Sequence, residues 1–335
     1  MSNCFIPKGY KSILTTYQTQ SAIGRLKRVF EDNLSMALNL HRVSAPLFVE
    51  PQTGLNDNLS GVERPVEFDI PETLGTAQIV HSLAKWKRLA LHKYGFSTGA
   101  GLYTDMNAIR RDETMDNTHS IYVDQWDWEV VITREQRNEE FLKQTVKRIV
   151  EAIYTTGERL RWDYTDLPVA IKRDVTFVTA QELEDLYPNL TPEERETQFT
   201  KEYKTVFVMK IGGMLKSGHR HGNRAPDYDD WNLNGDILLW HDVLGCAVEI
   251  TSMGIRVDAA VLDAQLKEAN CDYRRALSFH KSLLAGELPL TMGGGIGQSR
   301  LCMILMAKAH VGEVQVSVWD DKTLKACETA GVRLL

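Results

Sequence analysis

Apolar residues recur at helical spacing near the start of the chain, in the segment 21–40. The apolar positions are Ile23, Leu26, Phe30, Leu34 and Leu38, with charged residues at positions between them. This spacing predicts an amphipathic helix that buries one face. In the segment 41–49 that follows, Pro46 interrupts a β-prone run, which indicates an edge strand or an interface.

Two segments that alternate apolar and polar residues, 101–113 and 120–132, predict an antiparallel hairpin with a long tip at 114–119. The second strand contains the sequence VDQWDWE, residues 123–129. On a strand, an amide and two carboxylates would lie on one face and two tryptophans on the other. The other elements expected in the first half are short strands at 65–70 and 77–80, a helix at 83–93 and a long helix at 134–161.

Helices and strands also mix in the second half of the chain. Thr191, Pro192 and Glu194 form a helix start, with an N-cap, a proline in the first turn and a capping box. Strands are expected at 175–180, 205–213, 235–240 and 246–257, with two helices between 258 and 286, and the glycines at 293–295 indicate a strand or a glycine-rich turn. Several antiparallel pairs with helices beside them predict an α+β fold, a mainly antiparallel β-sheet flanked by helices. Because no clean linker interrupts the pattern, we expect one domain over residues 1–335.

Composition narrows the class of protein. The 335 residues include 39 basic and 45 acidic ones, for a net charge of -6, so no general electrostatic signal for nucleic acid or an anionic membrane is present. The five cysteines are widely spaced without a Cys-x-x-Cys pair, which fits thiols in a reducing compartment. No apolar run approaches the ~18 residues of a spanning helix. We therefore expect a cytoplasmic protein.

Three familiar nucleotide or metal motifs fail on spacing. The glycines of MGGGIGQSR do not satisfy Gly-x-Gly-x-x-Gly in any register. The pair Lys216–Ser217 lacks the two glycines of a phosphate-binding P-loop. His219 and His221 have no further cysteine or histidine at a zinc-site spacing, so a loop role is favoured over a metal.

Several longer strings carry a resemblance instead. AIRRDE, YVDQWDWE, CAVEITSMGIRV and GGGIGQSRL occur in the order expected for the catalytic core of class II aminoacyl-tRNA synthetases, especially the aspartate and asparagine enzymes. Together with NDNLSG, VHSLAKWKR, RAPDYDDW and LNGDI, they resemble the asparagine synthetase A family of aspartate-ammonia ligases over residues 9–319. One departure is the short segment between Asp230 and Asn234, which we interpret as a shortened loop.

The resemblance implies that asparagine is made from aspartate, ammonia and ATP through a β-aspartyl adenylate, with release of AMP and pyrophosphate. A carboxylate that approaches a polyphosphate is repelled, so fixed cations are needed. Arg110 is expected to contact the α-phosphate, and Arg300 to pair with the γ-phosphate or stack over adenine. Asp236 and Glu249 are expected to share Mg²⁺. The residues expected at ATP are Arg110, Asp236, Glu249, Ser252, Arg256, Gly294, Gly295 and Arg300.

The strip on strand 120–132 is then expected to form the floor of the aspartate pocket. Asp57 and Asp127 are candidates to hold the α-ammonium, Lys87 the α-carboxylate and Gln125 the side-chain end. Asp57 is alternatively the acceptor of a proton from incoming ammonium, because the nucleophile must be neutral ammonia. The expected substrate-binding residues are Asp57, His81, Ser82, Lys87, Gln125, Asp127 and Asp229, and the expected catalytic residues are Asp57, Arg110 and Gln125.

The resemblance also implies a homodimer through the helix at 21–40, with small molecules as the only other partners and neither nucleic acid nor a membrane bound. Two alternatives stay open. An aspartyl- or asparaginyl-tRNA synthetase would need an anticodon-binding domain, for which ~100 further residues are required. A non-catalytic sensor of an amino acid or nucleotide could lose catalytic cations, yet Arg110 and Arg300 are both present.

Overall fold

The computed structural model describes residues 4–59, 63–169 and 171–335. Its first helix, α1, spans Thr16–Leu38, and the side chain of Thr15 caps its N-terminus in a capping box with Gln18. The buried face carries Leu26, Phe30 and other apolar residues of the predicted stripe. The amphipathic helix predicted at 21–40 is therefore confirmed.

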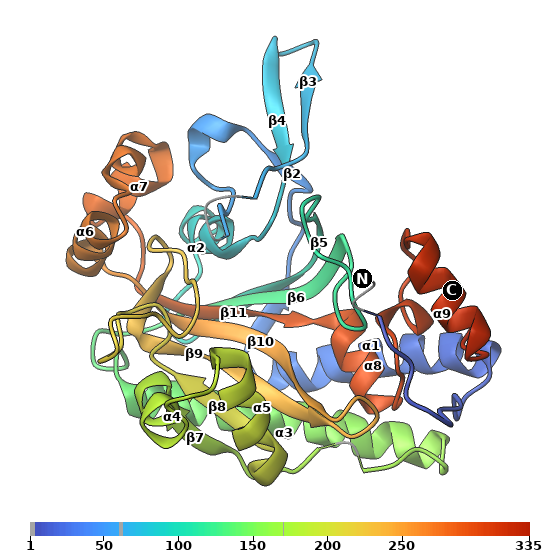
Figure 1. Ribbon diagram of the computed structural model, residues 1–335. Coiled ribbons are helices and arrows are strands. Elements are labelled where there is room, and N and C mark those ends of the chain that lie inside the picture. The colour runs from blue at the N-terminus through green and yellow to red at the C-terminus, as the bar shows by residue number, and fades with distance from the viewer. Residues whose placement is uncertain (1–3, 60–62, 170) are drawn as a thin grey trace.

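An eight-stranded sheet forms the centre of the fold (Figure 1). Its spatial order is β1-β5-β6-β11-β10-β9-β8-β7. The two outermost pairings are parallel and the five inner ones are antiparallel, which confirms the predicted α+β class with a mainly antiparallel sheet. The strands are β1 (Leu40–Arg42), β5 (Gly101–Ile109), β6 (Tyr122–Val131), β7 (Thr176–Thr179), β8 (Thr205–Met209), β9 (Asp229–His241), β10 (Cys246–Arg256) and β11 (Thr291–Gly297).

The two faces of this sheet differ. One face packs on α1 and the long helix α3 (Glu139–Asp163) in the largest hydrophobic cluster, which includes both tryptophans of the VDQWDWE strip. The opposite face carries the polar residues of that strip and lies beneath α2 (Ala84–Lys93) (Figure 1). The remaining helices of eight or more residues are α2 (Ala84–Lys93), α3 (Glu139–Asp163), α5 (Pro192–Tyr203), α6 (Ala259–Glu268), α8 (Gln298–Leu305) and α9 (Asp321–Thr329).

Smaller elements complete the described chain. A three-stranded sheet in the order β2-β4-β3 projects from the body at the top of Figure 1. Its strands are β2 (Phe48–Val49), β3 (Glu67–Ile70) and β4 (Gly75–Ile79), and the short helices are α4 (Ala180–Leu186) and α7 (Ser278–Leu284). Across the described ranges, every helix is too short or too polar to traverse a lipid bilayer.

The interpretation of residues 230–234 as a shortened loop is wrong. These residues belong to β9, and Asp229 and Asn234 pair with Arg256 and Gly254 of β10. Gln265 of α6 accepts a hydrogen bond from the Trp231 amide at 3.0 Å, which anchors the segment further. The segment is therefore part of a continuous strand, paired with β10 at both of its ends.

His241, at the end of β9, should make stability depend on pH. Burial lowers the pKa of His241 from 6.5 to about 4, and its Nδ1 accepts a hydrogen bond from the Leu244 amide at 3.3 Å. A pKa that is depressed in the fold stabilises above the unfolded value and loses that stabilisation as the pH falls. We expect the free energy of unfolding to fall from pH 6.5 towards pH 4, by up to about 1.4 kcal/mol per pH unit.

Denaturant unfolding of the wild type and His241→Asn across this range would measure the contribution. Asparagine is a suitable replacement because its Oδ1 can still accept from the Leu244 amide but does not titrate. The difference in unfolding free energy between the two proteins should narrow as the pH falls. Parallel pH profiles for the two proteins would contradict the assignment to His241.

Candidate active site

The VDQWDWE strip lies on β6, between β5 and β11. Trp126 and Trp128 are fully buried on the core face, where the Trp126 ring packs against Phe30 of α1 at a centroid distance of 4.6 Å. On the other face, Gln125 and Asp127 line a cavity. The alternation predicted from the sequence is therefore confirmed, and helix packing behind the indoles holds the polar strip rigid.

Two cavities open on this face of the sheet and share a boundary. Both are lined by Arg110, Gln125 and Ser252. The first cavity is further lined by Glu113, Thr118, His119, Ser120, Tyr122, Val123, Asp124, Glu249, Ile250, Gly297, Ser299, Arg300, Val311 and Gln315. The second cavity is further lined by Asp57, Leu59, Ser82, Ala84, Lys87, Asp127, Tyr228, Asp229, Arg256, Gly294 and Gly295.

Lys87 supplies a fixed cation to the second cavity. It comes from α2 and its ammonium donates to Asp127 and to the Gly294 carbonyl, the latter at 2.9 Å. Burial lowers the pKa of Lys87, and the neighbouring Asp127 carboxylate opposes that shift. The side chain is buried, so a small anion bound beside it would meet a charge with little screening by water.

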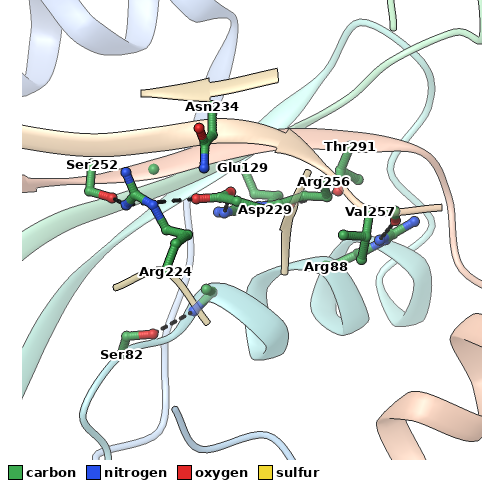
Figure 2. Close-up of polar contacts among 12 residues, drawn as sticks. Ser82, Arg88, Glu129, Arg224, Asp229, Asn234, Ser252, Arg256, Val257 and Thr291 are labelled. Carbon is green, nitrogen blue, oxygen red and sulfur yellow. Dashed lines mark hydrogen bonds and ion pairs between the residues drawn. The ribbon is translucent and has the colours of Figure 1, made fainter. Parts of the chain in front are cut away.

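Arg256 forms a second buried ion-pair cluster, with Glu129 and Asp229 (Figure 2). Its Nε and Nη2 donate to the Glu129 carboxylate at 2.7–3.1 Å, and Thr291 donates to the same carboxylate at 2.7 Å. Burial alone would raise the pKa of Glu129, but the Arg256 guanidinium outweighs it and the pKa is lowered. Glu129 is therefore ionised, and it holds the Arg256 side chain in place in the wall of the second cavity.

Arg256, Gly294 and Gly295, which were expected at ATP, line the second cavity with the expected aspartate residues. The two glycines belong to β11 beside β6. A Cβ atom at Gly295 would approach the Gln125 side-chain oxygen to 2.4 Å. A side chain there would displace Gln125, so glycine at this position keeps space open in the second cavity.

Asp57 lies in the wall of the second cavity, and its carboxylate accepts from the Leu59 amide at 3.0 Å. His81 is buried behind it, and its Nδ1 lies 3.1 Å from the Asp57 carbonyl oxygen. Burial lowers the pKa of His81, so this ring is neutral at physiological pH. Ser82 borders the cavity directly. Residues 60 and 61, at the end of the NDNLSG string that surrounds Asp57, lie outside the described part of the chain.

Arg300 and Glu249 border the first cavity. The Arg300 Nη1 donates to the Glu249 carbonyl oxygen at 3.0 Å, and its Nε donates to the Thr118 carbonyl oxygen at 3.2 Å. These two contacts come from β10 and from the loop before β6, so the guanidinium is held in one orientation at the cavity. A fixed planar cation of this kind suits either a phosphate or the face of an aromatic base.

Asp236 makes an ion pair with Arg224 at 2.6 Å, and the structure does not place it on either cavity wall. The pKa of Asp236 is raised to about 7, because burial and the negative charge of Glu249 together outweigh the opposing effect of Arg224. Two carboxylates that repel each other in this way form an oxygen donor set that a divalent cation would stabilise. Glu249 and Asp236 therefore fit the expected Mg²⁺ ligands chemically.

Sequence reasoning missed two residues of the site, Arg224 and Tyr228. Arg224 donates to Ser252 and Asp236 and lies 3.9 Å from Asp229, so it connects the second cavity to the paired carboxylates (Figure 2). Tyr228 lines the second cavity, and burial raises its pKa well above the ordinary value. Both belong to the RAPDYDDW string, whose alternation of charge and aromatic residues was the available signal.

Comparison with known proteins decides the family. The profile of the aspartate-ammonia ligase family matches residues 17–331. The chain belongs to the aspartate-ammonia ligase family. Its similarity to individual members is high along the whole length: it is 56% identical to the aspartate-ammonia ligase of Ruminiclostridium cellulolyticum, with 100% of both chains covered. It is 57% identical to that of Clostridium tetani, with 98% of this chain and 97% of the relative covered.

Solved structures similar to this aspartate-ammonia ligase family member are synthetases. The Entamoeba histolytica asparaginyl-tRNA synthetase in complex with asparaginyl-adenylate has a TM-score of 0.65 at 13% identity, with 90% of this chain and 66% of the synthetase covered. The Pyrococcus horikoshii enzyme complexed with asparaginyl-adenylate has a TM-score of 0.62 at 14% identity, with 88% and 68% covered. The likeness confirms the class II catalytic fold predicted from the motifs.

Proposed function

We propose that this chain makes asparagine from aspartate, ammonia and ATP through a β-aspartyl adenylate, releasing AMP and pyrophosphate. One observation carries the proposal: two polar cavities meet at Arg110, Gln125 and Ser252. Aspartate would occupy the second cavity and ATP the first. Their reacting groups would then face each other at the shared boundary. The 54–57% identity to aspartate-ammonia ligases supports the choice of substrates.

In the first step, the side-chain carboxylate of aspartate attacks the α-phosphorus and pyrophosphate leaves. Lys87 and Arg256 are the buried cations of the second cavity, so we assign them to the carboxylates of aspartate. Asp127 provides negative charge for its α-ammonium. Arg110 stabilises the charge that develops on the α-phosphate, because its guanidinium lies where the two cavities meet.

In the second step, ammonia attacks the adenylate carbonyl and AMP leaves. Ammonium must lose a proton first, and Asp57 is the carboxylate that we assign to receive it. Tyr228 lies close enough to Asp57 for that carboxylate to raise the pKa of the phenol. Since the phenol stays protonated, it can donate a hydrogen bond but cannot act as the base.

We assign Mg²⁺ to Asp236 and Glu249. When bound, the ion would offset the charge of the polyphosphate and of the departing pyrophosphate. Arg224 already places a positive charge beside the Asp236 carboxylate. A bound Mg²⁺ would share that carboxylate with the guanidinium. The carboxylates of Asp236 and Glu249 would fix where the cation binds, and their negative charge would lower the free energy of bringing it there.

Replacing Asp236 with asparagine should raise the Mg²⁺ concentration for half-maximal activity about tenfold, since one charged oxygen ligand is lost. In the wild type, this concentration should also rise as the pH falls below 7, because the pKa of Asp236 is about 7 and its protonated form binds cations poorly. Steady-state rates against Mg²⁺ at several pH values would test both effects. Asp242→Asn, at an exposed turn of the same hairpin, is the matched control.

The function itself is tested by product identification. The protein is incubated with ATP, Mg²⁺, aspartate and either ammonium or glutamine, and the amino-acid and nucleotide products are identified. Asparagine, AMP and pyrophosphate from the ammonium reaction are expected. Charging of tRNA would favour the synthetase alternative, and binding of aspartate without AMP formation would favour the sensor.

We further propose that the protein forms a homodimer through α1. We also propose that the chain is a single catalytic domain and that it binds no nucleic acid. The support for the dimer is the resemblance of α1 and the strand after it to the first motif of class II synthetases. The cytoplasmic location stays a prediction.

A further inference from the structure

Arg300 reaches the first cavity from the first turn of a helix. It is the third residue of α8, which begins at Gln298. Its Nε and Nη1 donate to the carbonyl groups of Thr118 and Glu249, and among the described residues Nη2 makes no hydrogen bond. Nη2 is therefore the donor that Arg300 can offer to a nucleotide. The direction in which it points depends on where the first turn of α8 lies.

The N-terminus of α8 has no capping side chain of its own. Strand β11 ends at Gly297, and the helix follows at the next residue without a loop. Gly297 is the N-cap residue and has no side chain that could accept a hydrogen bond. The first amides of a helix lack partners within the helix, so they need acceptors from elsewhere.

Asp124 of β6 supplies this acceptor from another element of the fold. Its Oδ1 accepts from the Ser299 amide at 3.1 Å, and its Oδ2 accepts from the Ser299 hydroxyl at 2.8 Å. A carboxylate at a helix N-terminus is stabilised by the helix dipole and by charge-assisted hydrogen bonds. Asp124 therefore acts on α8 as an N-cap residue acts on its own helix.

Two further side chains hold the Asp124 carboxylate in place. Lys27 of α1 donates to Oδ2 at 3.4 Å, and Gln315 donates to Oδ1 at 3.2 Å. Lys27 also donates at 2.6 Å to the side chain of Gln298, the first residue of α8. Neighbouring residues of a strand point to opposite faces, so Asp124 faces α1 whereas Gln125 faces the cavities. The first turn of α8 is thus fixed one residue away from the boundary between the two cavities.

We propose that Asp124 is the positioning residue for nucleotide binding by Arg300. Asp124 borders the first cavity but is only 8% exposed, and both of its carboxylate oxygens accept hydrogen bonds from protein groups. A carboxylate would also repel a polyphosphate. Asp124 acts instead through the first turn of α8, which it holds so that the Arg300 guanidinium faces the nucleotide. The inference rests on the proposed function, which assigns ATP to the first cavity.

A double-mutant cycle tests the proposal. Calorimetric titration with ATP and Mg²⁺ measures the nucleotide Kd of the wild type, Asp124→Ala, Arg300→Ala and the double variant. Each single variant should raise this Kd about tenfold, as expected for one charge-assisted hydrogen bond. The double variant should bind ATP within about twofold of Arg300→Ala, because loss of Asp124 has no effect once the guanidinium is absent. Independent effects, which multiply to about a hundredfold, would overturn the proposal.

Aspartate affinity separates a positioning role from a general loss of structure. Neither Asp124 nor Arg300 lines the second cavity, so the aspartate Kd should stay within about twofold of the wild type in both single variants. Ser299→Ala is a milder variant, which loses the hydroxyl contact and keeps the amide. It should raise the ATP Kd about threefold when Arg300 is present and leave it unchanged in Arg300→Ala. Unchanged ATP affinity in Ser299→Ala would overturn the proposal even if Asp124→Ala did not fold.

Asp320→Ala is the matched control, because Asp320 caps α9 by accepting from the Lys322 and Thr323 amides at 3.0 and 3.2 Å. Among the described residues, those of α9 line neither cavity. The control should lose stability and keep the wild-type ATP Kd. A loss of ATP affinity equal to that of Asp124→Ala would mean that lost stability alone explains the effect, and would overturn the proposal.

Failure of the proposed function would look different. A wild type that binds ATP but forms no asparagine would remove the ligase reaction, whereas the cycle between Asp124 and Arg300 can still be measured by binding. Coupling in that cycle would then support the inference without the reaction. Independent effects in a wild type that does form asparagine would overturn the inference alone.

Discussion

Replacing Arg110 with lysine should lower kcat about a hundredfold and change the affinities for aspartate and ATP much less. The side chain lines both cavities, so in the proposed reaction it would lie where the attacking carboxylate meets the α-phosphate. The Arg110 Nε is buried without a partner among the described residues. In the proposed reaction this guanidinium would donate to the α-phosphate as charge develops in the transition state, and loss of one such contact costs about 10²–10³ in rate.

Lysine keeps the positive charge of Arg110, so this variant separates charge from geometry. The ammonium group offers no planar pair of donors to the phosphate oxygens. Single-turnover formation of AMP would measure the chemical step directly. Arg111→Lys, at the neighbouring position with a side chain that is 47% exposed, is the control and should keep wild-type kcat. A wild-type kcat in Arg110→Lys would remove Arg110 from the transition state.

The sequence predicted the strands and helices well because their periodicity is local. The amphipathic stripe of α1 and the alternation in β6 depend only on which side of each element is buried. Each of these features is decided within a dozen residues.

The partners of the charged residues could not be predicted in the same way. The resemblance places Arg256 at ATP, and no local pattern indicates that its side chain pairs with Glu129 on β6 and Asp229 on β9. Such contacts join residues 27 to 127 positions apart, so they depend on strand order rather than on local pattern. Arg224 lies in the segment before β9, and its guanidinium contacts both Asp229 and Asp236 of that strand.

The expected Mg²⁺ pair illustrates the same limit. The prediction that Asp236 and Glu249 lie on adjacent strands of a hairpin is confirmed. The sequence did not reveal that Arg224 already neutralises Asp236. A position on a strand fixes the direction of a side chain, whereas its charge state depends on every group within reach.

Replacing Arg256 with methionine should destabilise the protein by about 3–5 kcal/mol, the usual cost of leaving buried carboxylates without their cation. Glu129 and Asp229 are almost completely buried, and both pair with this guanidinium. Aspartate affinity should fall as well. Without Arg256, burial would raise the pKa of Glu129 above its unfolded value, so the stability deficit should shrink as the pH falls from 7 to 5.

A double variant separates the structural role of Arg256 from its role in binding. In Glu129→Met/Arg256→Met, one unpaired carboxylate is removed along with the cation, so much of the lost stability should return. Aspartate affinity should stay low, because no cation replaces Arg256 in the second cavity. Denaturant unfolding and calorimetric titration with aspartate would measure the two quantities separately. Recovery of both stability and aspartate affinity would mean that Arg256 affects aspartate binding only by stabilising the fold. The positive charge itself would then be dispensable for binding.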